Sequence, residues 1–315
     1  MRVVSVFLAL AAGVSGAASA QTYPTQPVRV VTSEAGGGND LISRLVAQGI
    51  AGPLGQPVSV DNRPAGVVPG EVVAKATPDG HTLLIYNNTL WVAPLMRDAA
   101  YVATRDFAPI AELARTPNVV VVPTASAITS IADLIAAAKA RPGELRYGVS
   151  GMGAGNHLAG ELLAAMAGIR LVPVAFKGAN ASLNALFSNE TQLMFPTAVS
   201  ATPLVKSGKV RALGVTSAQP SALMPGVAPV ASFGLPGYES VTLFVAFAPV
   251  ATPRAIVDRL NGEILRFLNG PGTREKIFGL GMETIGSSPE QLAATMKSEL
   301  TRMEKVIRDA GIRIE

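Results

Sequence analysis

The pattern of apolar residues near the start of this chain predicts a strand that leads directly into a helix. Residues 28–31 are mostly β-branched, as in a buried strand, and three glycines follow at 36–38. Asn39 or Asp40 suits the start of the helix, because a short polar side chain there accepts a hydrogen bond from a free backbone N–H. The stretch therefore predicts a strand, a glycine turn and a helix in succession.

The segments that follow continue the alternation of strand and helix. We expect strands at 57–61 and 81–86, with a short helix at 71–75 between them. Right-handed crossovers between such strands give a mainly parallel, doubly wound α/β sheet.

A strand, a glycine turn and a helix recur in the middle of the chain. The second strand of this kind is expected at 146–150, and the glycine turn lies at 151–155. Further strands are predicted at 119–122, 172–176, 192–195, 210–215 and 241–249. Residues 217–237 show no periodic pattern and are interpreted as a linker or a surface crossing.

Three further helices are predicted from their start signals. Ser130 and Asp133 have the spacing of a capping box. Thr252-Pro253 starts a second helix, and Ser288 starts a last helix that runs to about residue 310.

Two glycine turns in two α/β units predict two lobes that face each other. We expect residues 21–122 and 226–315 to form one discontinuous lobe and residues 123–225 to form the other. Two crossing strands would then join the lobes and act as a hinge. Clefts between lobes are preferred ligand sites, and closure of the hinge around a ligand is the usual motion.

The first 20 residues have the pattern of a signal peptide. Arg2 precedes an apolar run, and Ala18-Ser19-Ala20 supplies the small residues needed for cleavage after Ala20. We therefore expect an exported protein whose mature chain begins at Gln21.

The composition removes several classes of function. The chain has no cysteine, which excludes disulfides, thiol catalysis and a lipoprotein anchor, and with two histidines a metal site is not expected. The formal net charge is +4, but no cluster of Lys and Arg gives the basic stripe that nucleic-acid binding requires.

The glycine turns carry the candidate chemistry. Such a turn exposes backbone N–H groups at the positive end of a helix dipole, which favours a carboxylate or a phosphate. The alternative is a tight connection that binds nothing. A dinucleotide site is disfavoured, because Leu41 stands where the third glycine of that motif belongs. Lys177 either attracts an anionic ligand or is a solvated loop residue.

Ser150 and His157 leave a hydrolase open as an alternative. Residues 148–152 nearly match a nucleophile elbow, but Met152 stands where a glycine is required. His157 is better interpreted as a helix-start or packing residue. A binding protein repurposed as a sensor is a further alternative.

Several segments, taken in order, resemble one family, the periplasmic solute-binding proteins of tripartite tricarboxylate transporters, also called the Bug family. The matching segments include GGGND at 36–40, DNRP at 61–64, VAKATPDGHTLL at 73–84, YGVSGMG at 147–153 and GKVRALGVTS at 208–217. The resemblance covers nearly all of the mature chain.

The resemblance implies a type II periplasmic-binding-protein fold, in which two loops of the first lobe grip a carboxylate like pincers. These pincer loops correspond here to 33–40 and 64–70. It implies a receptor in the periplasm, not an enzyme, that delivers an organic acid or an amino acid to integral-membrane permease subunits. We also expect a monomer with no cofactor and no metal. The expected ligand-binding residues are Ser33, Gly37, Gly38, Asn39, Asp40, Gly66, Val67, Asn87, Ser150, Gly151, Asn156, Lys177 and Thr197.

The chain departs from the family pattern where ligand contacts are expected. Ser33-Glu34-Ala35 stand where an aromatic residue and a Pro are usual, and Pro196 stands where an Asp is common. An acid beside the pincers weakens anion binding unless it points away or the ligand also carries a positive group. We expect a Val at Gly37 or Gly38 to block the amides and leave the fold intact.

Overall fold

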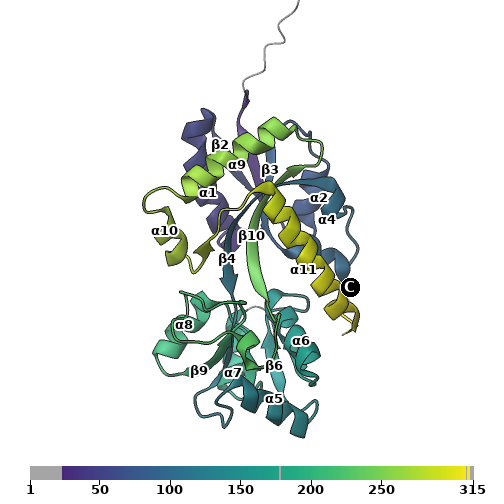
Figure 1. Ribbon diagram of the computed structural model, residues 1–315, viewed down its shortest axis with the longest axis vertical. Coiled ribbons are helices and arrows are strands. Elements are labelled where there is room, and N and C mark those ends of the chain that lie inside the picture. The colour runs from purple at the N-terminus through teal and green to yellow at the C-terminus, as the bar shows by residue number, and fades with distance from the viewer. Residues whose placement is uncertain (1–22, 177–178, 310, 313–315) are drawn as a thin grey trace, which may run out of the picture.

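The computed structural model describes residues 23–176, 179–309 and 311–312, so the expected signal peptide lies outside the described residues. The protein is an α/β protein with two sheets, placed one above the other along its long axis (Figure 1). No helix in these described ranges combines the length and the apolar character that a membrane span requires.

The first sheet is mixed and has the order β11-β4-β10-β3-β1-β2. Its strands are β1 (Val28–Thr32), β2 (Val58–Asn62), β3 (Thr82–Asn87), β4 (Phe107–Pro117), β10 (Val241–Pro249) and β11 (Glu283–Thr284). β1 is parallel to β2 and β3, but β10 is antiparallel to β3 and β4. The expectation of a mainly parallel sheet is therefore wrong, because β10 brings the chain back from the second sheet in the opposite direction.

The second sheet is also mixed and has the order β7-β6-β8-β5-β9. Its strands are β5 (Val119–Pro123), β6 (Arg146–Val149), β7 (Val172–Ala175), β8 (Leu193–Met194) and β9 (Val210–Val215). β6 is parallel to β7 and β8, whereas β5 is antiparallel to β8 and β9.

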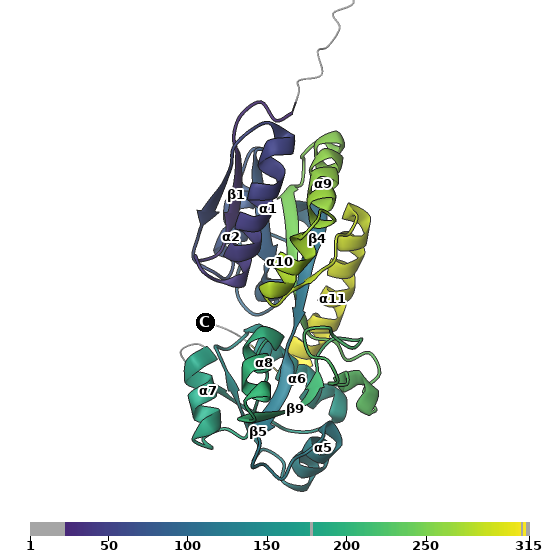
Figure 2. The same cartoon turned by 90° about the vertical axis from the view of Figure 1, so that its left-hand side faces the viewer.

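Helices cover both faces of the first sheet (Figure 2). One face carries α1 (Gly38–Leu54), α9 (Arg254–Leu268) and α10 (Thr273–Gly279). The other face carries α2 (Val68–Ala74), α3 (Thr89–Val92), the short η1 (Ala93–Leu95), α4 (Ala103–Asp106) and α11 (Pro289–Asp309). The second sheet is covered by α5 (Ile131–Ala140), α6 (Gly155–Ala167), α7 (Ala179–Phe187) and α8 (Ala198–Lys206), with η2 (Val230–Phe233) beside β9.

Alternation along the strands explains why the first sheet has a core on each face. In β3, Leu83 and Ile85 belong to the core under α1 and α9, whereas Leu84 and Tyr86 belong to the core under α2 and α11. Successive side chains of a strand point to opposite faces, so a strand buried on both sides must be apolar throughout.

β4 and β10 form the connection between the two sheets. They pair antiparallel from Val241 opposite Pro117 to Pro249 opposite Phe107. Only Asn118 separates the end of β4 from β5, which already belongs to the second sheet. The two crossing strands expected from the sequence are therefore present, while the lobe boundaries at 122/123 and 225/226 stay a prediction.

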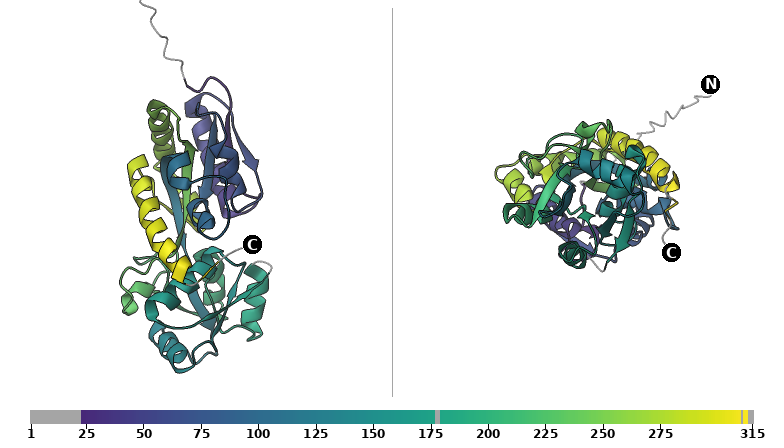
Figure 3. Two further views of the ribbon diagram at one scale, coloured as in Figure 1. Left: turned by 90° about the vertical axis from the view of Figure 1, so that its right-hand side faces the viewer. Right: turned by 90° about the horizontal axis from the view of Figure 1, so that it is seen from below.

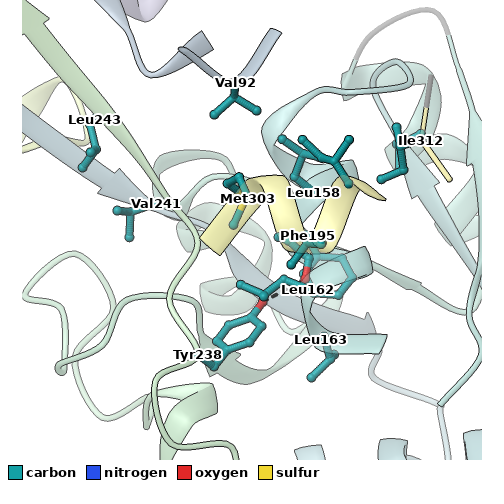
Figure 4. Close-up of a cluster of buried hydrophobic side chains, with 14 of the residues drawn as sticks. Val92, Leu158, Leu162, Leu163, Phe195, Tyr238, Val241, Leu243, Met303 and Ile312 are labelled. Atoms are coloured by element: carbon teal, nitrogen blue, oxygen red, sulfur yellow. Dashed lines mark hydrogen bonds between the residues drawn. The ribbon is translucent and has the colours of Figure 1, made fainter. Parts of the chain in front are cut away.

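α11 makes another connection between the lobes, since it packs along the first lobe and reaches the second (Figure 3). Near its C-terminal end, Met303 joins the same buried cluster as Leu158 and Leu162 of α6 (Figure 4). In that cluster the Tyr238 hydroxyl donates to the Ala159 carbonyl oxygen at 3.0 Å.

The capping box expected at α5 is confirmed. The Ser130 hydroxyl oxygen accepts the Asp133 backbone N–H at 3.0 Å, and Asp133 Oδ2 accepts the Thr129 backbone N–H at 3.0 Å and the Thr129 hydroxyl at 2.6 Å.

We expect Ser130→Ala to lower the free energy of unfolding by about 1 kcal/mol, because the Asp133 N–H loses its acceptor. Ser130→Asp keeps an acceptor and should stay close to the wild type. Urea denaturation of the three proteins measures the difference, and equal midpoints for Ser130→Ala and the wild type would contradict the importance of this cap.

Candidate ligand-binding site

The first glycine turn lies between the end of β1 and the start of α1. Gly36 has a left-handed backbone with φ of 84°, and Gly37 is the extended N-cap residue of α1. Among the described residues no acceptor contacts the backbone N–H groups of residues 37–40, as expected for the first turn of a helix. These N–H groups therefore form a ready anion site at the positive end of the α1 dipole.

The side chain of Asp40 holds this turn in place. Its Oδ2 accepts the Gly36 N–H at 2.9 Å and Arg44 Nε at 3.1 Å, and its Oδ1 accepts Asn62 Nδ2 at 2.8 Å. Burial acts to raise the pKa of Asp40, but these donors outweigh it and hold the pKa below its usual value. Protein donors occupy both oxygens of this carboxylate. The group of Asp40 that can contact a ligand is therefore its backbone N–H.

Ser33 and Asn39 are buried beside the same turn. Asn39 Nδ2 donates to the Ser33 hydroxyl oxygen at 2.9 Å, so the two side chains hold each other. Asn39 Oδ1 is buried without a hydrogen-bond partner in the described chain.

The second pincer loop is held by a tyrosine under it. Gly66, with φ of 86°, donates its N–H to the Tyr86 hydroxyl oxygen at 3.0 Å, and that hydroxyl donates back to the Gly66 carbonyl oxygen at 3.1 Å. Burial raises the pKa of Tyr86 to about 12, so the hydroxyl keeps its proton and can donate. Val67 follows as the N-cap residue of α2.

Glu34 links the two pincer loops. Its Oε1 accepts the Ala65 backbone N–H at 2.6 Å. The carboxylate is thus turned towards the second loop, and it leaves a negative charge at the edge of the candidate site.

A pocket on the second lobe brings together three of the expected residues, Ser150, Asn156 and Thr197. Its other polar lining comes from Asn118, Ser200 and Thr242, and its apolar lining from Leu183, Met194, Phe195 and Pro196. The Ser150 hydroxyl lies 3.3 Å from Asn156 Oδ1, and the hydroxyl oxygens of Thr197 and Ser200 are 3.1 Å apart. None of the described lining residues is ionisable, so this pocket offers neutral hydrogen-bonding groups.

A second pocket adjoins it at the crossing strands. The two pockets share Asn118, Gly155 and Thr242, and the second one encloses about 450 Å³ of empty space, open solvent included. Asn88 and Thr89 of the first lobe line it opposite α6. Polar groups of both lobes and of the crossing strands therefore line these two adjoining pockets, which together are called the hollow.

The remaining expected residues lie outside these two pockets. Asn87 lines neither pocket, and its Oδ1 accepts the Thr89 N–H at 3.0 Å. Gly37, Gly38, Gly66, Val67 and Gly151 contribute backbone at the turns and line neither pocket. Lys177 lies outside the described residues. Sequence reasoning missed Asn118 and Ser200, and the signal for Asn118 is a polar residue directly before the β-branched run 119–122.

Gly38 corrects one expectation from the sequence. A Cβ atom at Gly38 would lie 3.0 Å from Phe244 Cζ and 3.2 Å from Met282 Cε, so a larger side chain there disturbs the packing under α1. A Cβ at Gly37 meets only the Glu34 carbonyl oxygen, at 3.8 Å. Gly37 therefore has room for a side chain, and Gly38 does not.

His157 is the helix-start and packing residue that the sequence favoured. Its Nδ1 accepts the Gly153 N–H at 2.9 Å, its ring stacks on Tyr147, and its Nε2 lies 3.7 Å from Glu161 Oε1. It lines a different cavity from Ser150. The arrangement does not form the Ser–His pair that a hydrolase requires.

Two α/β lobes with a polar hollow over the strands that join them define a two-lobe solute-binding receptor. Residues 42–312 match the family model described as the tripartite tricarboxylate transporter family receptor. The chain belongs to this family of periplasmic solute-binding proteins.

Individual relatives cover almost the whole chain. A protein from the tcbD-tcbE intergenic region of Pseudomonas sp. strain P51 is 36% identical over 307 residues, which cover 96% of this chain and 91% of that protein. The solved structure of R. palustris Rpa4515 with adipate is 34% identical, with a TM-score of 0.77 over 92% of this chain and 99% of the other. MatC from Rhodopseudomonas palustris with bound malate is 27% identical, with a TM-score of 0.74 over 90% and 100%.

The buried His157 predicts an acid-sensitive fold. Burial lowers the pKa of His157 from 6.5 to about 4, so between these values the unfolded chain takes up a proton that the folded chain does not. The contribution of neutral, buried His157 to the free energy of unfolding is fully present above pH 6.5. It is lost as the pH falls towards 4, by up to about 3 kcal/mol.

We expect His157→Gln to flatten this part of the pH dependence, whatever its effect on stability at neutral pH. Urea denaturation of both proteins at pH 5 and pH 7.5 gives the difference. An identical pH dependence in the variant and the wild type would show that His157 is not the group responsible.

Proposed function

We propose that this receptor captures a small organic carboxylate between its two lobes and delivers it to the integral-membrane permease of a tripartite tricarboxylate-type transporter. The observation that carries the proposal is the set of backbone N–H groups at residues 37–40, at the start of α1, for which the described residues supply no acceptor. Relatives solved with adipate and with malate support a carboxylate as the ligand.

Charge at the site is compatible with an acidic ligand. The Asp40 carboxylate is neutralised by Arg44 and by backbone and amide donors, and Glu34 is turned to the Ala65 N–H. A hydrogen bond to a charged group contributes roughly 1.5–3 kcal/mol. Two or three such bonds, less the cost of ordering the ligand, correspond to roughly micromolar affinity.

Closure of the lobes provides the mechanism of capture. The first lobe offers the α1 amides, and the second offers the neutral groups of Ser150, Asn156 and Thr197. A carboxylic acid that contacts both stabilises the closed form, since a ligand shifts a conformational equilibrium towards the state that it binds better. The permease then recognises the closed form.

The cellular setting follows from the same proposal. Cleavage after Ala20 releases a monomeric receptor into the periplasm, with no cofactor and no catalytic activity. Residues 21–122 with 226–315 and residues 123–225 are its two lobes, hinged at β4 and β10.

A thermal-shift screen of organic acids tests the proposed function. A ligand that binds only the folded state raises stability by about 2.7 kcal/mol at a hundredfold excess over the dissociation constant. We expect at least one small carboxylic acid to raise the melting temperature and uncharged analogues of it to have no effect. If no carboxylic acid shifts the melting temperature, the proposed function fails.

Gly37→Val tests the role of the α1 amides. We expect at least a tenfold loss of affinity for the acid found in the screen, because the side chain covers N–H groups that contact the ligand. The melting temperature of the free protein should change little, since Gly37 has ordinary backbone angles and space around its Cβ position.

Gly262→Val is the matched control. Gly262 lies in α9, where a Cβ meets no atom within 4 Å, so this variant should bind as tightly as the wild type. Calorimetry measures all three proteins, and wild-type affinity in Gly37→Val would rule out the α1 amides as the carboxylate site.

A further inference from the structure

The edge strand β11 lies on the opposite side of the crossing strands from the candidate site. The order of the first sheet puts β11 on one side of β4 and β10, and β3, β1 and β2 on the other. The pincer loop 33–40 follows β1, and the pincer loop 64–70 follows β2. The carboxylate site therefore belongs to the front of the hinge, and β11 belongs to its rear.

Glu283 of β11 joins the two lobes at this rear side. Its Oε1 accepts the Ser221 hydroxyl at 2.6 Å and the Ala222 N–H at 3.0 Å. The segment that carries these two donors belongs to the second lobe, because Leu223 and Met224 are buried in the cluster formed around β5 and α8. We call the two hydrogen bonds of Glu283 the rear contact. Hydrogen bonds to a carboxylate are stronger than those between neutral groups.

The backbone next to Glu283 packs closely on both lobes. Gly281 has φ of 76°, and a Cβ atom built there would overlap the Val199 Cβ of α8, so only a glycine allows this approach. Figures 1 and 2 both show α10, which precedes this segment, directly over α8. Met282 is buried under the start of α1, where its Cε would lie 3.2 Å from a Cβ at Gly38. The rear contact is thus made by a segment with a fixed position.

The front of the hinge is open while the rear contact is formed. No residue of either pincer loop lines the two pockets of the hollow. A ligand that touches both the α1 amides and the pocket around Ser150 therefore requires the lobes to rotate about β4 and β10. A rotation that narrows the front widens the rear. Closure must then separate Glu283 from Ser221 and Ala222.

We propose that the rear contact is a conformational device that stabilises the open form of the receptor and thereby lowers its affinity for the ligand. The inference rests on the proposed function in one respect, because closure of the lobes is the step that captures the ligand. Binding has to break the two hydrogen bonds of Glu283, so the closed form is less populated than the ligand contacts alone would make it. The same bonds form again when the lobes open, which favours release of the ligand.

The distance between two spin labels tests the inference without a ligand. The chain has no cysteine, so Ser59→Cys and Asn184→Cys together give one labelled pair. Both residues are exposed; Ser59 lies in β2, the outermost strand at the front, and Asn184 lies in α7 on the same side of the second lobe (Figure 2). We expect Glu283→Ala to increase the population with the shorter distance about threefold or more in double electron–electron resonance. An unchanged or a longer distance overturns the inference.

Calorimetry with adipate gives a second readout. We expect Glu283→Ala to bind adipate about threefold or more tightly than the wild type, because the open form loses two hydrogen bonds that the closed form never had. Glu283 lines neither pocket of the hollow, so a direct effect on the ligand does not explain a gain. Ser221→Ala removes one of the two donors and should give a smaller gain. Equal or weaker binding of adipate in both variants contradicts the rear contact.

Glu275→Ala is the matched control for the loss of one carboxylate. Glu275 is exposed on α10, close to Glu283 in the same lobe, but lies outside the rear contact. This variant should keep the label distance and the adipate affinity of the wild type. If Glu275→Ala gave the same gain as Glu283→Ala, the effect would be one of net charge and the inference would fail.

The two readouts separate failure of the inference from failure of the proposed function. If adipate binds and Glu283→Ala changes neither the distance nor the affinity, the rear contact fails while carboxylate capture stands. If no carboxylic acid of the thermal-shift screen binds but Glu283→Ala shortens the distance, the proposed function fails and the rear contact stands.

Discussion

The structure depends on one constraint of helix geometry, which is that the first-turn N–H groups of a helix find no acceptor within the helix. At α1 the surrounding chain leaves these groups open. Gly36 turns away from β1 with a left-handed backbone, and its own N–H is taken by Asp40. Asp40 is in turn fixed by Arg44 and Asn62. The side chains of Asp40, Arg44 and Asn62 thus hydrogen-bond to one another, and the amides of residues 37–40, which have no acceptor among the described residues, remain for a ligand.

The connections between the lobes set how these amides approach the second lobe. β4 passes into β5 through Asn118, and β10 returns beside it. Glu299 of α11 fastens the first lobe at the same place, because its carboxylate accepts Asn88 Nδ2 at 2.6 Å and Trp91 Nε1 at 3.0 Å.

Much of this architecture was predictable from local sequence, and its exceptions have physical causes. Apolar runs located β1, β3, β5 and β10, and the Ser130 cap located α5. β4 escaped detection because Pro109, Glu112 and Arg115 interrupt its apolar pattern. Glu112 is nevertheless buried there, where Arg115 Nε donates to it at 3.0 Å. Hydrophobic periodicity does not reveal an ion pair within a strand. Because β4 was not predicted, Asn118, the polar residue that follows it, was missed as well.

The parts of the site that are formed by backbone N–H groups were predictable from the sequence. The glycine turns stood out in the sequence, whereas contacts between distant residues, such as the Tyr86 hydroxyl that holds Gly66, need the folded chain. A crystal structure of the protein with a bound carboxylic acid tests the central claim most directly. The account predicts a carboxylate oxygen at about 2.7–3.1 Å from backbone nitrogens of residues 37–40. An acid bound in the cleft without contact to these nitrogens would contradict it.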